Sequence, residues 1–241
     1  MYKYYFITFI INFVYLSFAS ELDRIIPPEI KNDSFYQCIY KLAKNERIST
    51  ILEIGSSSGE GSTEAFALGI KENPTHPTLF CMEISKPRYQ ALKKHYENLD
   101  QVKCYNISSV PFEAFPQESE VVNFFNNTST NLNQYGCQRV LGWLRQDIEY
   151  IKSSNLPQNG IEIIKAENNI DNFDMVLIDG SEFSGMAEFK LIYGAKFILL
   201  DDINAFKNYN NYQQLLNDPN YELIEKNIKL RNGYAVFKRK I

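Results

Sequence analysis

Residues 51–63, with the sequence ILEIGSSSGEGST, constrain the fold of this chain more than any other stretch. A short apolar run ends at Gly55, small residues follow, and an apolar segment typical of a helix begins at Ala65. Glycine permits positive φ and close approach of a ligand, and a helix that starts there points free N–H groups into the turn. The stretch predicts the first crossover of a doubly wound α/β sheet with a nucleotide-type ligand. An ordinary strand-to-helix turn without a ligand is the alternative.

The spacing of the glycines narrows the class of ligand. Gly55, Gly59 and Gly61 do not match the G-x-G-x-x-G pattern of dinucleotide folds, and the turn has no lysine for a phosphate loop. Glu60 would also repel a pyrophosphate. Glu53, at the end of the predicted strand, can accept a hydrogen bond from an ammonium group. An adenosine with a cationic end, as in S-adenosylmethionine, fits these features.

Carboxylates recur where other predicted strands end. The apolar runs 79–82, 174–178 and 197–200 predict buried strands, which are followed by Glu83, by Asp179, and by Asp201 with Asp202. Open parallel sheets bind ligands beyond the carboxyl ends of their strands, and an acid at the second strand end can reach ribose hydroxyls. This recurrence predicts a site at that edge. The alternatives are a helix cap at Glu83 and a loop cap at Asp201 and Asp202.

Two further stretches complete the predicted sheet. Residues 102–106 predict a third strand, which is followed by the polar residue Ser108. Residues 228–237 alternate on both sides of Asn232-Gly233, which predicts a C-terminal hairpin. Residues 161–164 are expected to form a short strand or strand extension, and residues 35–45, with helical spacing, are expected to form a helix that covers the ligand.

The chain resembles class I S-adenosylmethionine-dependent methyltransferases over nearly all of residues 35–240. Glu53-x-Gly55-x-x-x-Gly59 resembles their first motif, and residues 173–180 and 198–202 resemble the catechol and macrolide-sugar O-methyltransferase branches. The resemblance implies an α/β fold: a Rossmann-like, doubly wound, mostly parallel seven-stranded sheet with a C-terminal antiparallel hairpin. It also implies an enzyme that methylates a hydroxyl oxygen of a small molecule or sugar.

The resemblance assigns roles to particular residues. The expected cofactor-binding residues are Glu53, Gly55, Ser57, Gly59, Glu83, Ser108 and Asp179. The expected ligands of a Mg²⁺ ion are Asp179, Asp201 and Asp202, and the expected catalytic residues are Asp179 and Asp202. Such an ion prefers oxygen ligands and lowers the pKa of a bound hydroxyl. The chain departs from the pattern at Glu182, near which related proteins often have a histidine, and in its Asp-Asp pair, where the catechol branch has Asp-Asn.

Composition excludes several other classes of site. The 25 basic and 29 acidic residues include no basic run, so a nucleic-acid groove is not indicated. The four cysteines form no C-x-x-C pair and are expected to be free thiols. Two alternatives for the function stay open: an NAD- or nucleotide-sugar-binding oxidoreductase, which the glycine spacing disfavours, and a catalytically silent ligand-binding protein, since no general base is evident.

Residues 111–160 do not fit the alternation of strands and helices and are predicted to be an insertion. The segment contains a polar Asn/Thr tract at 126–133. An amphipathic helix follows, with Val140, Leu141, Leu144, Ile148 and Ile151 on one face. At this place an insertion could cover the acceptor pocket.

Residues 4–19 are nearly all apolar and end in Ser17-Phe18-Ala19, a small-x-small pattern. Their length is short for a membrane-spanning helix and right for the apolar region of a signal peptide. We therefore predict a signal peptide or a membrane anchor over residues 1–19 and a methyltransferase domain over residues 20–241. A mistaken start is the third alternative. The localisation stays open, because a secretory or membrane location conflicts with a cofactor made in the cytosol.

Deletion of residues 1–19 tests this division of the chain. We expect the shortened protein to unfold within a few degrees of the full chain, because every predicted strand lies after these residues, and to be more soluble, because an apolar patch is removed. Thermal unfolding followed by circular dichroism measures the first effect. A large loss of stability would show that the segment belongs to the core.

Overall fold

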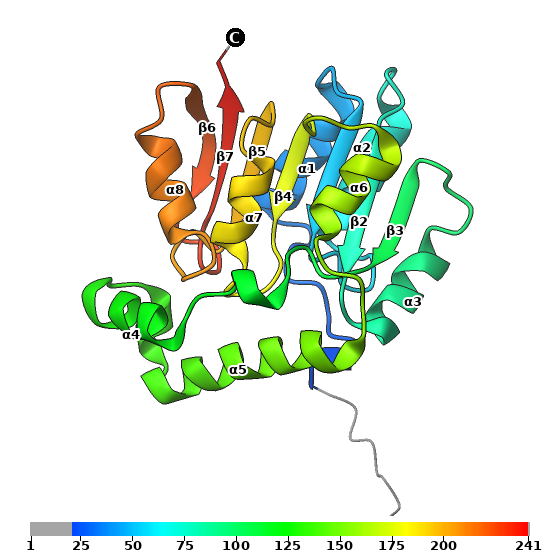
Figure 1. Cartoon of the computed structure of the whole chain (residues 1–241). Helices are drawn as coiled ribbons and strands as arrows, with labels where there is room; N and C mark the ends of the chain where they lie inside the picture. Colours follow the sequence, from blue (N-terminus) through cyan, green and yellow to red (C-terminus); the bar gives the residue numbers. More distant parts are fainter. Residues whose placement is uncertain (1–20, 241) are drawn as a thin grey trace, which may run out of the picture.

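A computed structural model describes residues 21–240 as a seven-stranded sheet covered by helices (Figure 1). The strand order is β3-β2-β1-β4-β5-β7-β6. The first five strands run parallel, and β7 pairs antiparallel with both β5 and β6. The predicted Rossmann-like sheet with its terminal hairpin is therefore confirmed. Its strands are β1 (Thr50–Ile54), β2 (Thr78–Glu83), β3 (Val102–Asn106), β4 (Met175–Ile178), β5 (Phe197–Asp201), β6 (Tyr221–Asn227) and β7 (Tyr234–Arg239).

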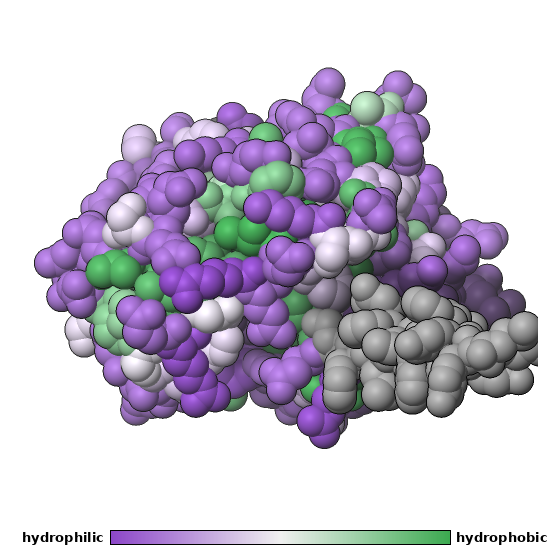
Figure 2. All heavy atoms as spheres, turned by 60° about the horizontal axis from the view of Figure 1, so that its bottom comes forward, coloured by the Kyte–Doolittle hydropathy of each residue, from purple (hydrophilic) through white to green (hydrophobic). Residues whose placement is uncertain are grey.

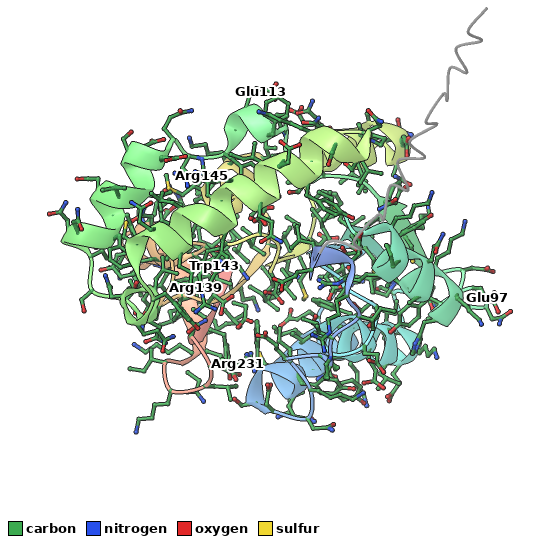
Figure 3. All side chains as sticks on the ribbon, turned by 90° about the horizontal axis from the view of Figure 1, so that it is seen from below. Glu97, Glu113, Arg139, Trp143, Arg145 and Arg231 are labelled. Atoms are coloured by element: carbon green, nitrogen blue, oxygen red, sulfur yellow. The ribbon has the colours of Figure 1, made fainter. Side chains whose placement is uncertain are left out.

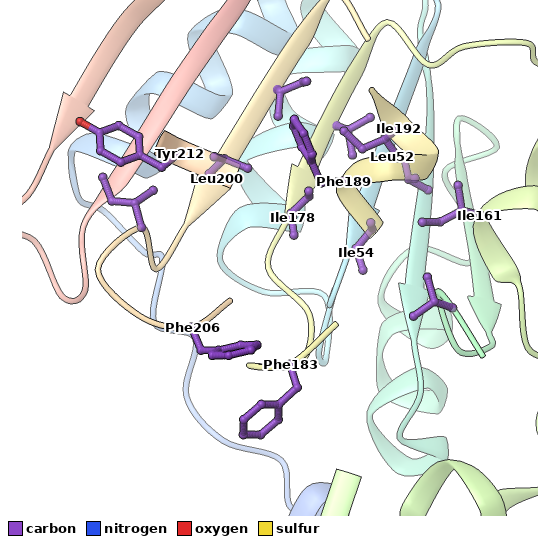
Figure 4. Packing of buried hydrophobic residues seen from close by; sticks show 14 of the residues in the cluster. Leu52, Ile54, Ile161, Ile178, Phe183, Phe189, Ile192, Leu200, Phe206 and Tyr212 are labelled. Atoms are coloured by element: carbon purple, nitrogen blue, oxygen red, sulfur yellow. The ribbon is translucent and has the colours of Figure 1, made fainter. Parts of the chain in front are cut away.

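Helices cover both faces of the sheet because neighbouring strand residues point to opposite sides. One face carries α1 (Ser34–Asn45), α2 (Ser62–Glu72) and α3 (Lys86–His95); the other carries α6 (Gly160–Asn168), α7 (Gly185–Ile192) and α8 (Tyr209–Leu216). In β1, Ile51 packs toward the first layer, and Leu52 and Ile54 pack toward the second. Figure 4 shows this second layer, where Phe189 and Ile192 of α7 lie against the strands.

The segment predicted to be an insertion folds as two helices, α4 (Glu118–Asn127) and α5 (Cys137–Ser154). Helix α5 crosses below the carboxyl ends of the parallel strands (Figure 1). The predicted amphipathic face is confirmed: Val140, Leu141, Leu144 and Ile151 are buried, and Ile148 is partly buried against the same core. Whether the segment is an insertion relative to other proteins stays a prediction.

Three expectations need correction. Residues 161–164 belong to helix α6, not to a strand: Ile161 and Ile164 are three residues apart and share its buried face. The first strand of the hairpin ends at Asn227, and residues 228–233 form the connection, in which Ile228 is 63% exposed. Helix α1 forms as predicted but packs against α2, and none of its residues lines the ligand cavity described below.

The structure also bears on the predictions for the cysteines and for a membrane-spanning segment. All four cysteines are free thiols, and Cys81 and Cys104 face each other across β2 and β3. Between residues 21 and 240, the structure contains no helix with the length and apolar character needed to cross a bilayer. The signal peptide or anchor predicted at 1–19 lies outside the described residues.

Two glycines inside helices provide a matched test of packing. A Cβ at Gly69, in α2, would lie 2.6 Å from the Cβ of Ala43 and 2.8 Å from the carbonyl oxygen of Tyr40, whereas a Cβ at Gly142, in α5, would meet nothing within 4 Å. Alanine favours both helices by about 0.5–1 kcal/mol. We expect Gly142→Ala to raise the free energy of unfolding by that amount. We expect Gly69→Ala to lower it by about 1–3 kcal/mol through overpacking. Urea unfolding measures both, and equal changes would contradict the α1–α2 packing.

Candidate functional site

A cavity of about 350 Å³ lies at the carboxyl ends of β1, β2 and β4. Strand order reverses between β1 and β4, so the cavity occupies the position where open α/β sheets bind ligands. Figure 2 brings this side forward and shows apolar residues among the hydrophilic ones. In the view from below, α5 crosses this edge of the sheet (Figure 3). The cavity walls therefore come from the strand ends, the glycine turn and α5.

Packing requires glycine at two positions of the turn. A Cβ at Gly55, where φ is +92°, would lie 2.2 Å from the carbonyl oxygen of Asp179 at the end of β4. A Cβ at Gly59 would meet the ring of Tyr96, the residue that follows α3. Gly55 lines the cavity, but Gly59 is not among the lining residues. Ser57, with a φ of 49°, lines the cavity.

The structure places Glu53 behind the turn. Its side chain is fully buried, does not line the cavity, and accepts a hydrogen bond of 2.6 Å from the hydroxyl of Thr63 at the start of α2. This contact joins β1 to α2, and burial raises the pKa of Glu53. Within residues 21–240, Oε1 of Glu53 and the hydroxyl of Ser56 have no hydrogen-bond partner. Ser56 lines the cavity, but its hydroxyl is shielded from solvent beside Glu53.

Glu83 and Ser108 lie on the cavity wall beyond β2 and β3. Oε1 of Glu83 accepts from the backbone N–H of Ser85 at 2.6 Å, and burial raises the pKa of its carboxyl. Asn106 supports this corner by donating to the carbonyls of Glu83 and Ile84. The hydroxyl of Ser108 donates to the carbonyl of Val110. An acid, an isoleucine and a hydroxyl therefore face the same end of the cavity.

The predicted acid cluster forms at the other end. Carboxylate oxygens of Asp179, Asp201 and Asp202 lie within 4.8 Å of one another. Strand β5 ends at Asp201, and Asp202 has a φ of 54°, which allows these consecutive side chains to approach the same point. Asp179 and Asp202 line the cavity, whereas Asp201 is 1% exposed and is not among the lining residues.

Two cations meet this cluster. The ammonium of Lys207 lies 2.6 Å from Oδ2 of Asp202 and 2.9 Å from Oδ1 of Asp179. The guanidinium of Arg231 lies 3.2 Å from Oδ1 of Asp201 and also pairs with Asp33. The sequence did not indicate either cation, because Lys207 lies in a loop without a motif and Arg231 comes from the hairpin connection.

These contacts separate the pKa values of the acids. Burial raises the pKa of Asp179 to about 6 and that of Asp201 well above its ordinary value. Burial would raise the pKa of Asp202 as well, but the charge of Lys207 and its hydrogen bond bring it below the ordinary value. Burial opposes the charge of Lys207, yet the surrounding carboxylates raise its pKa well above 10.5. Asp202 and Lys207 are therefore a charged pair at neutral pH.

Two segments close the cavity from outside the sheet. Asp147 and Tyr150 of α5 line it: Asp147 accepts from the hydroxyl of Ser181, and Tyr150 donates to Asp23. The segment 22–30 lies on the glycine turn, where a Cβ at Gly61 would come within 2.8 Å of the carbonyl oxygen of Ile30. The sequence showed the apolar face of α5 but not these polar contacts, which depend on the tertiary fold.

Glu182 provides a test of the electrostatics beside this cluster. Its Oε1 accepts from the backbone N–H groups of Phe206 and Lys207, and burial raises its pKa from 4.5 to about 7. Between these values the folded chain holds a proton that the unfolded chain has released, so the free energy of unfolding falls as the pH rises. Glu182→Gln keeps an accepting oxygen and removes this effect. We expect the melting temperature of Glu182→Gln minus that of the wild type to increase by a few degrees from about pH 5 to pH 8. Parallel pH profiles would contradict the raised pKa.

In comparisons with known proteins, no protein-family model and no curated protein matches the sequence. The structure is similar to the O-methyltransferase from Bacillus cereus in complex with SAH, with a TM-score of 0.54 and 14% identity over 89% of this chain and 84% of that chain. It is also similar to a methyltransferase from Geobacter sulfurreducens, with a TM-score of 0.51 and 10% identity over 88% of this chain and 81% of that chain. The chain therefore has the class I methyltransferase fold that its motifs resemble.

Proposed function

We propose that this protein is an enzyme that transfers a methyl group from S-adenosylmethionine to a hydroxyl oxygen of a small molecule or sugar. One observation carries the proposal: a single cavity at the topological switch point joins the glycine turn and Glu83 at one end to Asp179 and Asp202 at the other. The first end suits a nucleoside donor and the second an acceptor. The structural neighbours, one of them in complex with SAH, support the same function.

The lining residues fit the donor. Glu83 can accept from ribose hydroxyls, while Ile84 and Ser108 offer an apolar contact and a hydroxyl for the adenine. Gly55, Ser56 and Ser57 of the glycine turn line the cavity where the cationic end of the donor would pass. The carboxylate of Glu53 lies behind the cavity wall, so Glu53 is expected to affect the donor indirectly, through the glycine turn. It would contact the donor directly only if the turn opened.

The residues at the acceptor end can perform the remaining chemistry. Bound S-adenosylmethionine supplies an electrophilic methyl group. When the acceptor oxygen bonds to this methyl carbon, the C–S bond breaks and the sulfur keeps its electron pair. Asp179, whose pKa is raised to about 6, is placed to take the proton from the acceptor hydroxyl. Asp202 holds Lys207 at the same wall. Alignment of donor and acceptor in one cavity contributes the rest of the rate enhancement.

The resemblance implies a Mg²⁺ ion at the three carboxylates of this end. The three carboxylates are the oxygen donors that Mg²⁺ prefers. However, Lys207 and Arg231 already face these carboxylates, so the side chains as arranged do not fit a divalent ion. No step of the proposed reaction therefore involves the metal.

Calorimetric titration of the full chain with S-adenosylmethionine tests the donor site. We expect binding by the wild type and at least about tenfold weaker binding by Glu83→Gln, which loses a charged acceptor for the ribose but can still accept from Ser85. The matched control is Glu97→Gln, because Glu97 is exposed, is not among the lining residues and lies at the right edge of the molecule in Figure 3.

Binding of NADH without any signal from S-adenosylmethionine would favour the oxidoreductase instead. Transfer of a labelled methyl group to a panel of hydroxylated acceptors separates an enzyme from a silent binding protein. Binding of the donor without turnover on any acceptor would favour the silent binding protein.

A further inference from the structure

Lys207 occupies the centre of the acid cluster. It lies in the loop between β5 and α8, and its side chain is 7% exposed. Its ammonium bridges Oδ1 of Asp179, beyond β4, and Oδ2 of Asp202, beyond β5. The lysine thus holds a positive charge between the ends of two neighbouring strands, and it also lines the cavity.

The backbone around Lys207 is fixed from three sides. Glu182 accepts from the N–H groups of Phe206 and Lys207, at 2.7 and 3.3 Å. The carbonyl of Lys207 packs on Gly185, where a Cβ would lie 2.1 Å from its oxygen. The buried Asn208 donates to the carbonyls at the ends of β4 and β5, those of Ile178 and Asp201. These contacts fix the backbone position from which the side chain of Lys207 reaches the cluster.

Two further oxygens of the cluster are also engaged. Arg231 faces Oδ1 of Asp201, and the amide of Asn232 donates to Oδ1 of Asp202 at 3.0 Å. An ammonium has no lone pair and cannot be a metal ligand. It also repels a divalent cation at short range. Since Mg²⁺ demands a near-ideal shell of oxygens, this cluster has no place for it while Lys207 remains.

We propose that Lys207 is a built-in replacement for a divalent cation and that this site acts without metal. The inference rests on the proposed function, whose acceptor oxygen would lie at this wall. An ammonium has three N–H groups, and the contacts with Asp179 and Asp202 use two of them. The third donates to the acceptor oxygen and stabilises the negative charge that develops there as its proton passes to Asp179.

This arrangement also defines the class of acceptor. A metal ion with two open positions can chelate two adjacent oxygens, whereas one N–H group binds one oxygen. Lys207 therefore suits an acceptor with a single isolated hydroxyl, and a neighbouring hydroxyl is not required.

Binding of Mn²⁺, followed by the electron paramagnetic resonance signal of the free ion, tests the inference without reference to activity. We expect the full wild-type chain to leave the signal of added Mn²⁺ unchanged. We expect Lys207→Ala, which leaves the carboxylates without their ammonium, to bind one Mn²⁺ per chain, and Asp179→Asn in that background to abolish the binding. Lys190→Ala, at an exposed lysine of α7, is the matched control and should behave as the wild type.

One Mn²⁺ bound by the wild type and lost in Asp179→Asn would overturn the inference, and so would a folded Lys207→Ala that binds none. Circular dichroism checks the fold of each variant, and the wild-type titration decides alone if Lys207→Ala does not fold.

Methyl transfer provides a second readout. We expect EDTA to leave the wild-type rate unchanged. Lys207→Met should lower the rate by about 100-fold or more, as for loss of one donor to a developing oxyanion, and change the affinity for S-adenosylmethionine by no more than about twofold, since Lys207 contacts the acceptor. Loss of activity in EDTA that Mg²⁺ restores would overturn the inference. Calorimetry detects failure of the proposed function separately, as an absence of donor binding in the wild type.

Discussion

Compensation of buried negative charge is the constraint on which this site depends. Three carboxylates meet beyond β4 and β5, where mutual repulsion and loss of water would oppose their ionisation. Lys207 and Arg231 bring positive charge to them from the loop after β5 and from the hairpin connection. The antiparallel end of the sheet thus has a role in the site, because it delivers one of the two cations.

The glycine turn depends on close contact in a similar way. Gly55 lets the turn after β1 touch the backbone of Asp179, and Gly61 lets the segment 22–30 lie on the turn. The end of the cavity at the glycine turn and the end at Asp179 are therefore joined through the backbone at the switch point. Helix α5 completes the enclosure, since Tyr150 reaches Asp23 across the opening.

Local patterns made most of the fold predictable. Apolar runs that end in glycine or in acids revealed four of the five parallel strands, and the period of α5 revealed its buried face. The prediction of a strand at 161–164 was wrong because a short apolar run fits either element, and only the contact of α6 with the second layer decides between them. The convergence of Asp179, Asp201 and Asp202 was predictable because parallel strands end at one edge. Lys207 was not, since a loop lysine has no pattern and its position depends on Glu182, Gly185 and Asn208.

The fixed position of Lys207 has a consequence for how such a protein would depend on its surroundings. A metal centre must be loaded, can lose its ion to a competing chelator, and responds to the supply of that ion. A positive charge on a side chain is present once the chain has folded, and one ammonium accompanies every copy of the protein. The chain would give up the adjustable chemistry of an exchangeable ion and gain a charge that cannot be depleted.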